Sequence, residues 1–497
     1  MTSSFRISNI ADLTRFNLQN TRPGQRVSSK FWISDWLELL LKHIAINRLG
    51  PTHTSRWVFL FTNIVYNSYQ FVLKTKSPVD SQYWTSNKKG VLNQNLESWI
   101  ELSCQYFVPL LITQYMNLNL DTNMTSNLIN KHKPLQQVNN ASFNLLKQLI
   151  NTYLSNRDND GWKNTSTFNG NLPNGQNVIH ADNSVDENLN LLPNVNKWTP
   201  LSLGGSVKNY LTPEWGTLNS GLILESETKE ILEKTNELYP SDLAYEKEMK
   251  DVIEITKNLD DQQKVLAEFW AGGPGTVTPP GMWIVFLDIY MRSNYMTFSE
   301  EIKNYVLLAS GIYQAGIYAW KLKREHLQAR PIQKIRQYLH DDENELKQEW
   351  NEKNSSRYWL PYQELNFVTP PFPDFVSGHS TFSSVSAKLF CYMFGTDIID
   401  LTNPSINNDI IDYLSPILEN KDNFTLNNIF IFANSSHVKD TLPISPVHLN
   451  WSSWTEMANS SGKSRIYGGI HCESSNQGGL FLGSKIADKI WKLLKNI

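Results

Sequence analysis

Apolar side chains recur every three or four residues along much of this 497-residue chain, a spacing that predicts amphipathic helices. The segments that show it most clearly are residues 29–49, 55–73, 96–116, 140–154 and 298–324. Alternation with a period of two, which would indicate half-buried strands, is nearly absent. Because 40% of the residues are hydrophobic, the chain can bury a large core. We therefore expect an all-α protein made of helical bundles with long functional loops.

Loop-rich stretches divide the chain. Residues 156–190 are rich in Asn, Asp and Gly and are the clearest candidate linker. They end an N-terminal helical region, residues 1–190, which a larger region, residues 191–497, follows. We expect the two regions to form one integrated domain. Residues 271–281, AGGPGTVTPPG, predict a turn-rich connection rather than a helix. The acidic run at residues 340–354 predicts a solvated helix or loop.

The start of the first helix and the targeting of the chain can also be read from the sequence. Ser34 and Asp35 are candidate helix starts. The first 19 residues lack the apolar core of a secretory signal, so we expect a soluble protein that is cytoplasmic by default. The longest nearly apolar stretch, Tyr305–Trp320, contains glycines, tyrosines and Gln314, which favours a buried helix over a membrane span.

Charge and cysteine content exclude several classes of function. The formal net charge is -3, so no strong field of either sign favours nucleic acid or an anionic membrane as the main partner. The three cysteines are an odd number and lie far apart. They therefore offer neither a disulfide framework nor a CxxC metal site.

The stretch KREHLQARP, Lys323–Pro331, is the first candidate functional motif. Lys323 and Arg330 are seven residues apart, so a continuous helix would place both on one face. Pro331 indicates instead that a new helix begins there, with Arg330 in an extended turn before it. A solvated basic helix end is the ordinary explanation, because cations are favoured at helix C-termini.

A proline-rich turn leads into the second motif, Ser377-Gly378-His379, and then into a predicted helix. Ser377 or Ser380 would cap this helix. The N–H groups of a helix N-terminus favour a bound anion, and Gly378 would allow it to approach closely. A serine-capped helix with a surface histidine would explain the same residues.

The third motif, SRIYGGIH, places Arg465 six residues before His471, with Gly468 and Gly469 between them. The glycines would let the chain bend, so that both side chains reach one site. A glycine turn with Arg465 in a salt bridge and His471 in the core is the competing explanation.

Together the three motifs point to an oxyanion site. In this order they would occur by chance in roughly one of tens of thousands of chains of this length. Three cations and two neutral donors are available from Lys323, Arg330, Arg465, Ser377 and Gly378. Guanidinium groups match the oxygens of a tetrahedral anion bidentately. Of the two histidines, one can attack or ligate the central atom while the other moves protons on the opposite side.

The order K-x6-RP, SGH, SR-x5-H resembles the type 2 phosphatidic acid phosphatase and vanadium-dependent haloperoxidase superfamily. The soluble bacterial, chloroperoxidase-like haloperoxidases are the more similar branch, because AGIYAWKLKREHLQARPIQKIR, TPPFPDFVSGHSTFS and GKSRIYGGIH are similar to their stretches. Other stretches are similar too, namely Trp198–Gly216, Glu268–Trp283, Leu449–Ala458 and, more weakly, Ile46–Trp57. The resemblance covers most of the chain after about residue 29, apart from the Asn-rich loop and the segment before the second motif.

This resemblance implies two four-helix bundles, with vanadate bound in the second. The positions that match the family's vanadate site are Lys323, Arg330, Ser377, Gly378, His379, Arg465 and His471. His471 would be the axial ligand of vanadium, and His379 would act as acid and base toward hydrogen peroxide. Vanadate would serve as a Lewis acid, so that a halide attacks the bound peroxide and gives hypohalous acid. The implied partners are hydrogen peroxide, a halide and an organic halogen acceptor; a homo-oligomer stays open, and no haem is implied.

Two aromatic residues match positions beside the halide in chloroperoxidase-type members. They are Trp320 and Phe372, and together they are a candidate halide pocket. Plain aromatic core explains them as well, so the identity of the halide stays open.

Two carboxylates that are common in relatives are missing. Aspartate four residues after the ligating histidine is replaced by Ser475, and aspartate in the FWA-x-GP stretch is replaced by Gly272. Such carboxylates orient a histidine or balance an arginine. Glu473, Asp374 and Glu268 are the candidate substitutes.

Three hypotheses therefore stand. The first is a vanadate-dependent haloperoxidase. The second is a soluble acid phosphatase that uses His471 as nucleophile and His379 to protonate the leaving group, because the same donors would hold phosphate. The third is an inactive scaffold that retains the fold, for which the replacements at Gly272 and Ser475 are the support.

Overall fold

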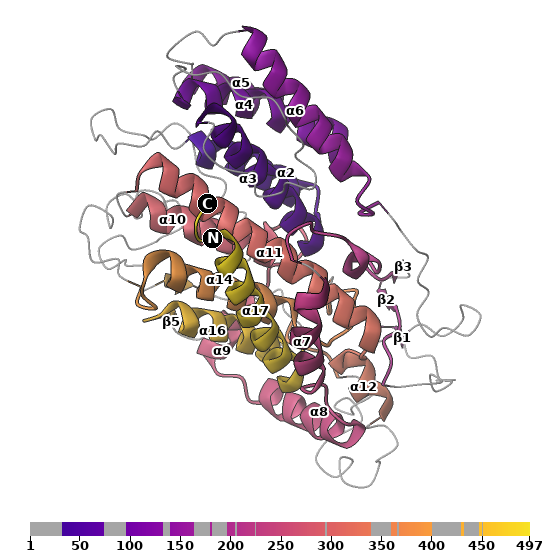
Figure 1. Cartoon of the computed structure of the whole chain (residues 1–497). Helices are drawn as coiled ribbons and strands as arrows, with labels where there is room; N and C mark the ends of the chain where they lie inside the picture. The colour runs from indigo at the N-terminus through magenta and orange to yellow at the C-terminus, as the bar shows by residue number, and fades with distance from the viewer. Residues whose placement is uncertain are drawn as a thin grey trace, which may run out of the picture.

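The structure is a computed structural model of the chain, and its course is shown in Figure 1. It describes residues 32–73, 96–132, 140–163, 179–180, 196–203, 206–223, 225–293, 296–338, 359–364, 367–399, 429–431, 447–449 and 451–497. The acidic run and most of the Asn-rich stretch lie outside these residues, so the predictions for them are not addressed by the structure.

Five helices make up the N-terminal end of the molecule, drawn in indigo and purple in Figure 1. They are α2 (Trp32–Ile46), α3 (Pro51–Leu73), α4 (Leu96–Leu110), α5 (Thr122–Lys131) and α6 (Asn140–Asp158). A π-helical turn, Leu111–Tyr115, follows the end of α4. Pro109 in the last turn of α4 lacks the N–H of a regular helical hydrogen bond. Nearly every described side chain of α3 from position 52 onward is buried, so this helix is the core of the N-terminal group.

The remaining helices make up the larger part of the molecule. They are α7 (Glu225–Asn236), α8 (Asp242–Lys257), α9 (Asp261–Phe269), α10 (Thr278–Ser293), α11 (Phe298–His326), α12 (Pro331–Tyr338), α14 (Gly378–Phe394), α16 (Trp454–Tyr467) and α17 (Glu473–Leu494). Within the described residues, strands are confined to a small sheet in the order β1 (Ile179–His180), β2 (Leu201–Leu203), β3 (Ser206–Lys208), and to the pair β4 (Ile429–Ile431) and β5 (Val447–Leu449). The all-α fold class is therefore confirmed.

Helix α11 joins the two groups of helices. It packs against α3 on one side and against α14 and α17 on the other, and in Figure 1 it crosses the middle of the molecule. One continuous cluster of buried apolar residues includes members of α2, α3, α10, α11, α14 and α17. Helix α11 forms a helical bundle with α14, α16 and α17. The three motifs lie at the ends of these four helices.

Local sequence signals explain where these helices begin and end. The capping box of Thr297 and Glu300 starts α11, and Leu327, in the left-handed conformation, ends it. Pro331 begins α12, as the sequence predicts. The predicted cap of α14 is also confirmed, because the Ser377 hydroxyl accepts a hydrogen bond from the backbone N–H of Ser380 at 3.2 Å.

Two helix boundaries differ from the sequence prediction. Residues 278–281 were expected to be part of a turn-rich connection, but they form the first turn of α10. Prolines are tolerated there because the first-turn N–H groups have no partner within the helix. Ser34 and Asp35 lie inside the first turn of α2 rather than before it, and the Ser34 hydroxyl donates to Asp288 at 2.6 Å.

A buried ion pair ties the end of α6 to the core. Nη1 of Arg56 on α3 lies 2.5 Å from Oδ2 of Asp160, and both side chains are almost fully buried. The same guanidinium donates to the backbone carbonyl of Arg157 at 2.6 Å and to the hydroxyl of Tyr313 on α11 at 3.2 Å. Three helices therefore meet at one charged group whose hydrogen bonds hold them together.

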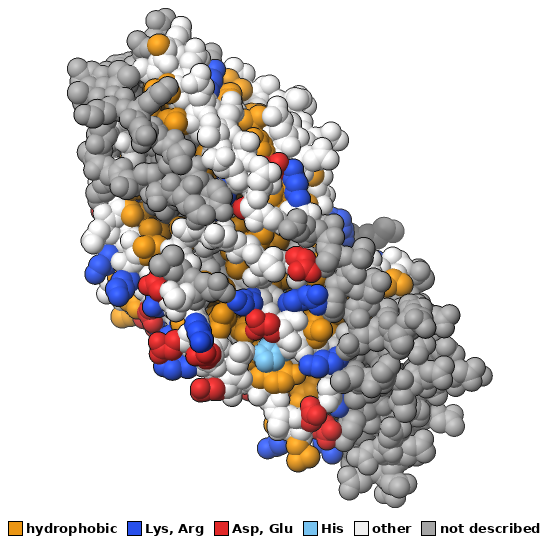
Figure 2. Space-filling view, turned by 45° about the vertical axis from the view of Figure 1, so that its right-hand side comes forward, with side chains coloured by type: hydrophobic (Ala, Val, Ile, Leu, Met, Phe, Trp, Pro, Cys, Tyr) orange, Lys and Arg blue, Asp and Glu red, His pale blue; other side chains and the backbone are white. Residues whose placement is uncertain are grey.

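The described surface is mixed in charge. On the face shown in Figure 2, basic and acidic side chains are interspersed, and no large area carries one sign. No helix in the described part of the chain is long and apolar enough to cross a bilayer.

Candidate active site

The motif residues meet at one end of the α11, α14, α16 and α17 bundle. Lys323 lies in the last turn of α11 and Arg465 in the last turn of α16. Arg330 directly precedes α12, and His471 lies two residues before α17. All four side chains are at most 1% exposed, so this is a buried site that carries charge.

Backbone carbonyls of the loop before α14 bind two of the cations, and the carbonyl of Ile470 binds one of them as well. The ammonium of Lys323 donates to the carbonyls of Pro373 and Asp374 at 2.7 and 2.8 Å. Nε of Arg330 donates to the carbonyl of Phe372 at 2.7 Å, and its Nη1 donates to the carbonyl of Ile470, also at 2.7 Å. The loop before α14 therefore fixes where both positive charges lie.

The arginines keep hydrogen-bond donors that no described residue accepts. Nη2 of Arg330, and both Nε and Nη2 of Arg465, are buried without a partner among the described residues. Nη1 of Arg465 has only a long contact, 3.3 Å, to the carbonyl of Ala267. Buried donors left unsatisfied are costly, which indicates that an acceptor with several oxygens belongs between these groups.

His471 is held in one orientation from both sides of its ring. Its Nδ1 contacts a carboxylate oxygen of Asp374, and the hydroxyl of Ser475 lies 3.1 Å from the same nitrogen. Nη1 of Arg330 lies 3.0 Å from Nε2 and can only donate. The neutral tautomer with its proton on Nδ1 fits both contacts, so a lone pair on Nε2 faces the cations.

Asp374 takes the place of the carboxylate that the sequence lacks at Ser475. The other candidates lie elsewhere, since Glu473 pairs with Lys463 on the surface at 2.7 Å and Glu268 accepts from Tyr362 at 2.6 Å. Ser475 assists Asp374, because its hydroxyl donates to the Asp374 backbone carbonyl at 2.9 Å. The second carboxylate oxygen, Oδ2, has no partner among the described side chains and backbone groups.

His379 lies on the first turn of α14 and is half-buried, so it is the more accessible histidine. Its Nε2 lies 2.8 Å from the backbone carbonyl of Trp270 and so carries the proton in the neutral ring. Gly272 adjoins this ring, since a Cβ there would lie 3.4 Å from Nε2. The φ of Gly272 is +54°, a conformation that aspartate adopts only with strain. The backbone carbonyl of Trp270 is therefore the hydrogen-bond partner of Nε2 of His379.

The second motif also contributes a helix end. Ser377 is fully buried, its hydroxyl caps α14, and Gly378 is the first residue of that helix. The hydroxyl proton of Ser377 and the first N–H groups of α14 are donors of the kind that bind anions. Ser377 is anchored to the first turn of α17, because its N–H donates to the carbonyl of Ser475 at 2.9 Å.

The two aromatic candidates pack beside the cations. The ring centroids of Trp320 and Phe372 are 4.9 Å apart. The ammonium of Lys323 lies 5.1 Å from the Phe372 ring centre, and the guanidinium carbon of Arg330 lies 4.9 Å from it. A Cβ on Gly378 would lie 3.7 Å from the Trp320 ring, so the pair forms an apolar wall next to the helix end.

Burial shifts the pKa values of the whole group, and the single carboxylate of Asp374 offsets this only in part. Burial lowers the pKa of Arg330 to about 10, and burial with repulsion from Arg330 lowers the pKa of Arg465 to about 9. The pKa of Lys323 falls well below its usual value for the same two reasons. Burial raises the pKa of the Asp374 carboxyl to about 6, although Arg330 and Lys323 oppose this. Three cations face one carboxylate here, so a doubly charged anion would balance the described groups.

The arrangement differs from a metal centre built from several protein ligands. The described residues include no cluster of three or more histidine, cysteine, aspartate or glutamate side chains that could hold a metal ion. Cations, a helix N-terminus and one histidine lone pair suit a tetrahedral oxyanion whose central atom accepts one further ligand.

Sequence reasoning missed the backbone partners in this site. The carbonyls of Phe372, Pro373 and Trp270 have no sequence signal, because every residue carries the same group. Asp374 was one of three candidates, and the choice between them rests on the fold alone.

Comparison with known proteins agrees with this architecture. Residues 303–497 match the family model of the VCPO second helical-bundle domain. No curated protein sequence matches the chain. A bacterial vanadium-dependent iodoperoxidase structure, described as the first, is similar with a TM-score of 0.58 and 16% identity, over 93% of this chain and 96% of that one.

Two bacterial vanadium-dependent chloroperoxidase structures are similar as well. The apo-type structure has a TM-score of 0.60 and 15% identity, over 91% of this chain and 96% of that one. The holo-type structure has a TM-score of 0.59 and 13% identity, over 90% of this chain and 93% of that one. The chain therefore has the all-α fold of the vanadium-dependent haloperoxidases over most of its length, which confirms the resemblance seen in the sequence.

Proposed function

We propose that this protein is a vanadate-dependent haloperoxidase, which uses hydrogen peroxide to oxidise a halide to hypohalous acid. The observation that carries the proposal is the set of unpartnered guanidinium N–H groups of Arg330 and Arg465 near the Nε2 lone pair of His471. An oxyanion of charge about two would satisfy these donors, and vanadate is one that also accepts a nitrogen ligand.

The residues present fit vanadate. Arg330, Arg465 and Lys323 would bind its oxygens, together with the Ser377 hydroxyl and the N–H of Gly378. His471 would provide the single nitrogen ligand through Nε2. Bound vanadate would supply Lewis acidity, which polarises hydrogen peroxide for attack by a halide without a change in metal oxidation state.

The chain's own residues prepare that chemistry. Asp374 accepts the Nδ1 proton of His471 and so keeps the lone pair on Nε2. Burial lowers the pKa of His379 well below its usual value, with Arg465 adding to the effect, so its ring is neutral at pH 7. The Nδ1 lone pair of His379 can then take a proton from hydrogen peroxide and return it later. Trp320 and Phe372 would exclude water on the side where a halide approaches.

Phosphate-ester hydrolysis is the second candidate function. The same donors would hold phosphate, and a neutral histidine oriented by a carboxylate is what a nucleophile needs. The contact between His471 and Asp374 is the observation that supports it. In this case His379 would protonate the leaving group.

One set of assays separates the candidates. Purified protein would be given hydrogen peroxide, one of chloride, bromide or iodide, and a freely diffusing halogen acceptor, with and without orthovanadate. We expect vanadate-dependent halogenation that His379→Ala lowers by about 10²- to 10⁴-fold while vanadate still binds. Absence of halogenation with every halide would overturn the proposal. Ester hydrolysis abolished by His471→Ala would then support the phosphatase, and inactivity in both assays would leave the scaffold.

A further inference from the structure

Helix α8 lies outside the three motifs but packs beside the candidate active site. In Figure 1 it lies at the lower end of the molecule, next to α12. It also packs against α16, the helix that carries Arg465. A second cluster of buried apolar side chains, separate from the main core, includes four residues of α8, namely Tyr245, Met249, Val252 and Ile253.

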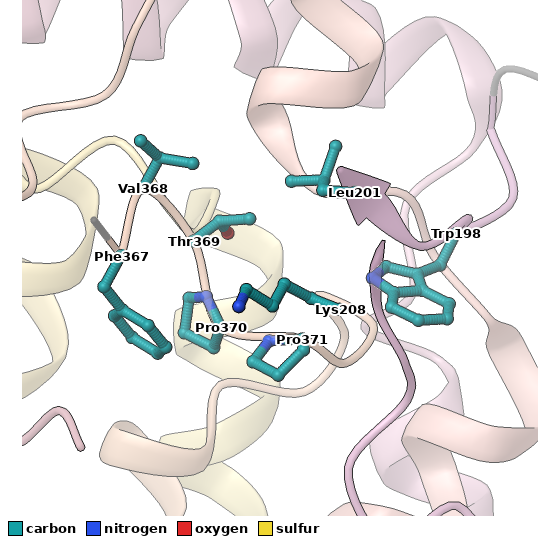
Figure 3. Close-up of a pocket in the computed structure, with 8 residues that line it drawn as sticks. All are labelled: Trp198, Leu201, Lys208, Phe367, Val368, Thr369, Pro370 and Pro371. Carbon is teal, nitrogen blue, oxygen red and sulfur yellow. The ribbon is translucent and has the colours of Figure 1, made fainter. Parts of the chain in front are cut away.

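This second cluster reaches all three motifs close to their site residues. It includes the residue two positions after Arg330, the residue after Arg465 and the residue after His471, which are Ile332, Ile466 and Cys472. Leu201 and Val368 also belong to it, and they line the pocket drawn in Figure 3, between β2 and the loop that leads to α14. Packing against α8 therefore links the segments that carry the site.

Tyr245 adds a hydrogen bond to the first motif. Its hydroxyl donates to the carbonyl of Ala329 at 2.6 Å, and both residues are buried. The N–H of Ala329 donates in turn to the carbonyl of Asn196 at 2.9 Å, so this residue is held on two sides. Ala329 directly precedes Arg330, whose Nη1 lies 3.0 Å from Nε2 of His471. The tyrosine therefore helps to fix where this guanidinium meets the histidine.

Glu248 lies about one turn further along the same face of α8 and binds the start of α17. Its carboxylate oxygens accept from the N–H of Ser474 at 2.9 Å and from the Ser474 hydroxyl at 2.8 Å. Cys472, at the N-cap position of α17, makes no side-chain cap, so a glutamate from another helix takes that role. The next residue, Ser475, has its hydroxyl 3.1 Å from Nδ1 of His471.

We propose that Tyr245 and Glu248 are positioning residues of the oxyanion site, through which α8 sets how Arg330 and His471 face each other. Both act through a neighbouring residue rather than on the anion itself. Tyr245 acts on a cation that any tetrahedral anion would need. Glu248 acts on the histidine, which vanadate would need as a ligand and sulfate would not, so this half of the inference rests on the proposed function.

Calorimetric titration with sulfate and with orthovanadate tests the two contacts separately. Tyr245→Phe removes only the hydroxyl, and we expect it to weaken the binding of both anions about three- to tenfold. Glu248→Ala should weaken vanadate binding about three- to tenfold and leave sulfate binding unchanged. Glu254→Gln is the matched control, because Glu254 is exposed on the same helix, and it should change neither affinity.

Glu248→Gln separates the position of this side chain from its charge. Glutamine keeps an oxygen that can accept the Ser474 N–H, and its NH₂ can donate to the Ser474 hydroxyl. The variant should therefore restore the vanadate affinity that Glu248→Ala loses. A contribution to stability alone would lower the denaturation midpoint without distinguishing the two anions in the folded protein.

Unchanged affinity for both anions in Tyr245→Phe would overturn the proposal, and this variant tests it even if Glu248→Ala does not fold. Unchanged vanadate binding in Glu248→Ala, or equal loss of both anions there, would also overturn it, as would a loss in Glu248→Gln as large as in Glu248→Ala. Wild-type protein that binds sulfate but not vanadate would instead overturn the proposed function. The effect of Tyr245→Phe on sulfate would then still test the positioning of Arg330.

Discussion

Replacing Asp374 by asparagine would remove one negative charge from the site with little change in volume. The carboxylate accepts the Nδ1 proton of His471, and Ser475 holds its backbone in place. The asparagine amide can turn its NH₂ toward Nδ1, which would move the histidine proton to Nε2 and remove the lone pair. Vanadate needs that lone pair as a ligand, whereas sulfate needs only the cations.

The expected loss of vanadate affinity follows from the single hydrogen bond between Asp374 and His471 that the substitution removes. A hydrogen bond to a buried charged group contributes about 1.5–3 kcal/mol. Loss of a carboxylate that orients a ligating histidine weakens metal binding by about 10- to 100-fold, which agrees with that range. Asp374→Asn should therefore weaken vanadate binding by this factor. Sulfate binding should be unchanged or stronger, because the pocket becomes more positive.

Isothermal titration calorimetry with orthovanadate and with sulfate would measure both effects. Glu473→Gln is the matched control, since Glu473 is a surface carboxylate whose side chain is 40% exposed and which pairs with Lys463. It should change neither affinity. Equal vanadate affinity in Asp374→Asn and wild type would refute the positioning role, and equal loss of both anions would show a general defect of the pocket.

Three further predictions concern other parts of the structure. Arg465→Lys keeps the charge but removes the Nε and Nη2 donors, so sulfate should bind more weakly by about 1–2 kcal/mol in the same calorimetric assay. Unchanged sulfate affinity would contradict the role given to these two guanidinium donors. Gly272→Asp should lower the unfolding free energy by about 1–2 kcal/mol in denaturant titrations, because a Cβ at this left-handed φ is disfavoured and would lie 3.0 Å from Cδ of Pro279. It should not raise activity, although it restores the aspartate that the family resemblance leads us to expect at this position. Asp160→Asn leaves Arg56 buried without its counter-ion and should cost about 3–5 kcal/mol of stability, while the sulfate affinity of the folded protein stays as in wild type; a change below 1 kcal/mol would show that this ion pair is dispensable.

The candidate site could be predicted from the sequence because its residues are concentrated in three short motifs. Lys323 and Arg330 flank a helix break that Pro331 signals, and the helix that follows Ser377 was predicted with its cap. These features are local, so propensity and capping rules are enough to place them. The long helix before them was predicted at residues 298–324 and runs from 298 to 326.

The partners of these residues could not be found in the same way. Asp374 and His471 are 97 residues apart, and nothing in either segment indicates that they meet. Glu473 lies closer to His471 in the sequence, but the first turn of α17 directs it to the surface, where it pairs with Lys463. The carbonyl of Trp270 beside His379 is a backbone group, so no residue type marks it.

The position of Asp374 also bears on how relatives of this protein are recognised. A screen that requires an acidic residue four positions after the histidine proposed to bind vanadate would discard this chain, because that position is Ser475. A spatial criterion, a carboxylate oxygen in contact with Nδ1 of that histidine, would retain it. Chains that lack an acidic residue at that position can be examined for this contact, and an acidic residue three positions before the SGH motif, where Asp374 lies here, is the first feature to check.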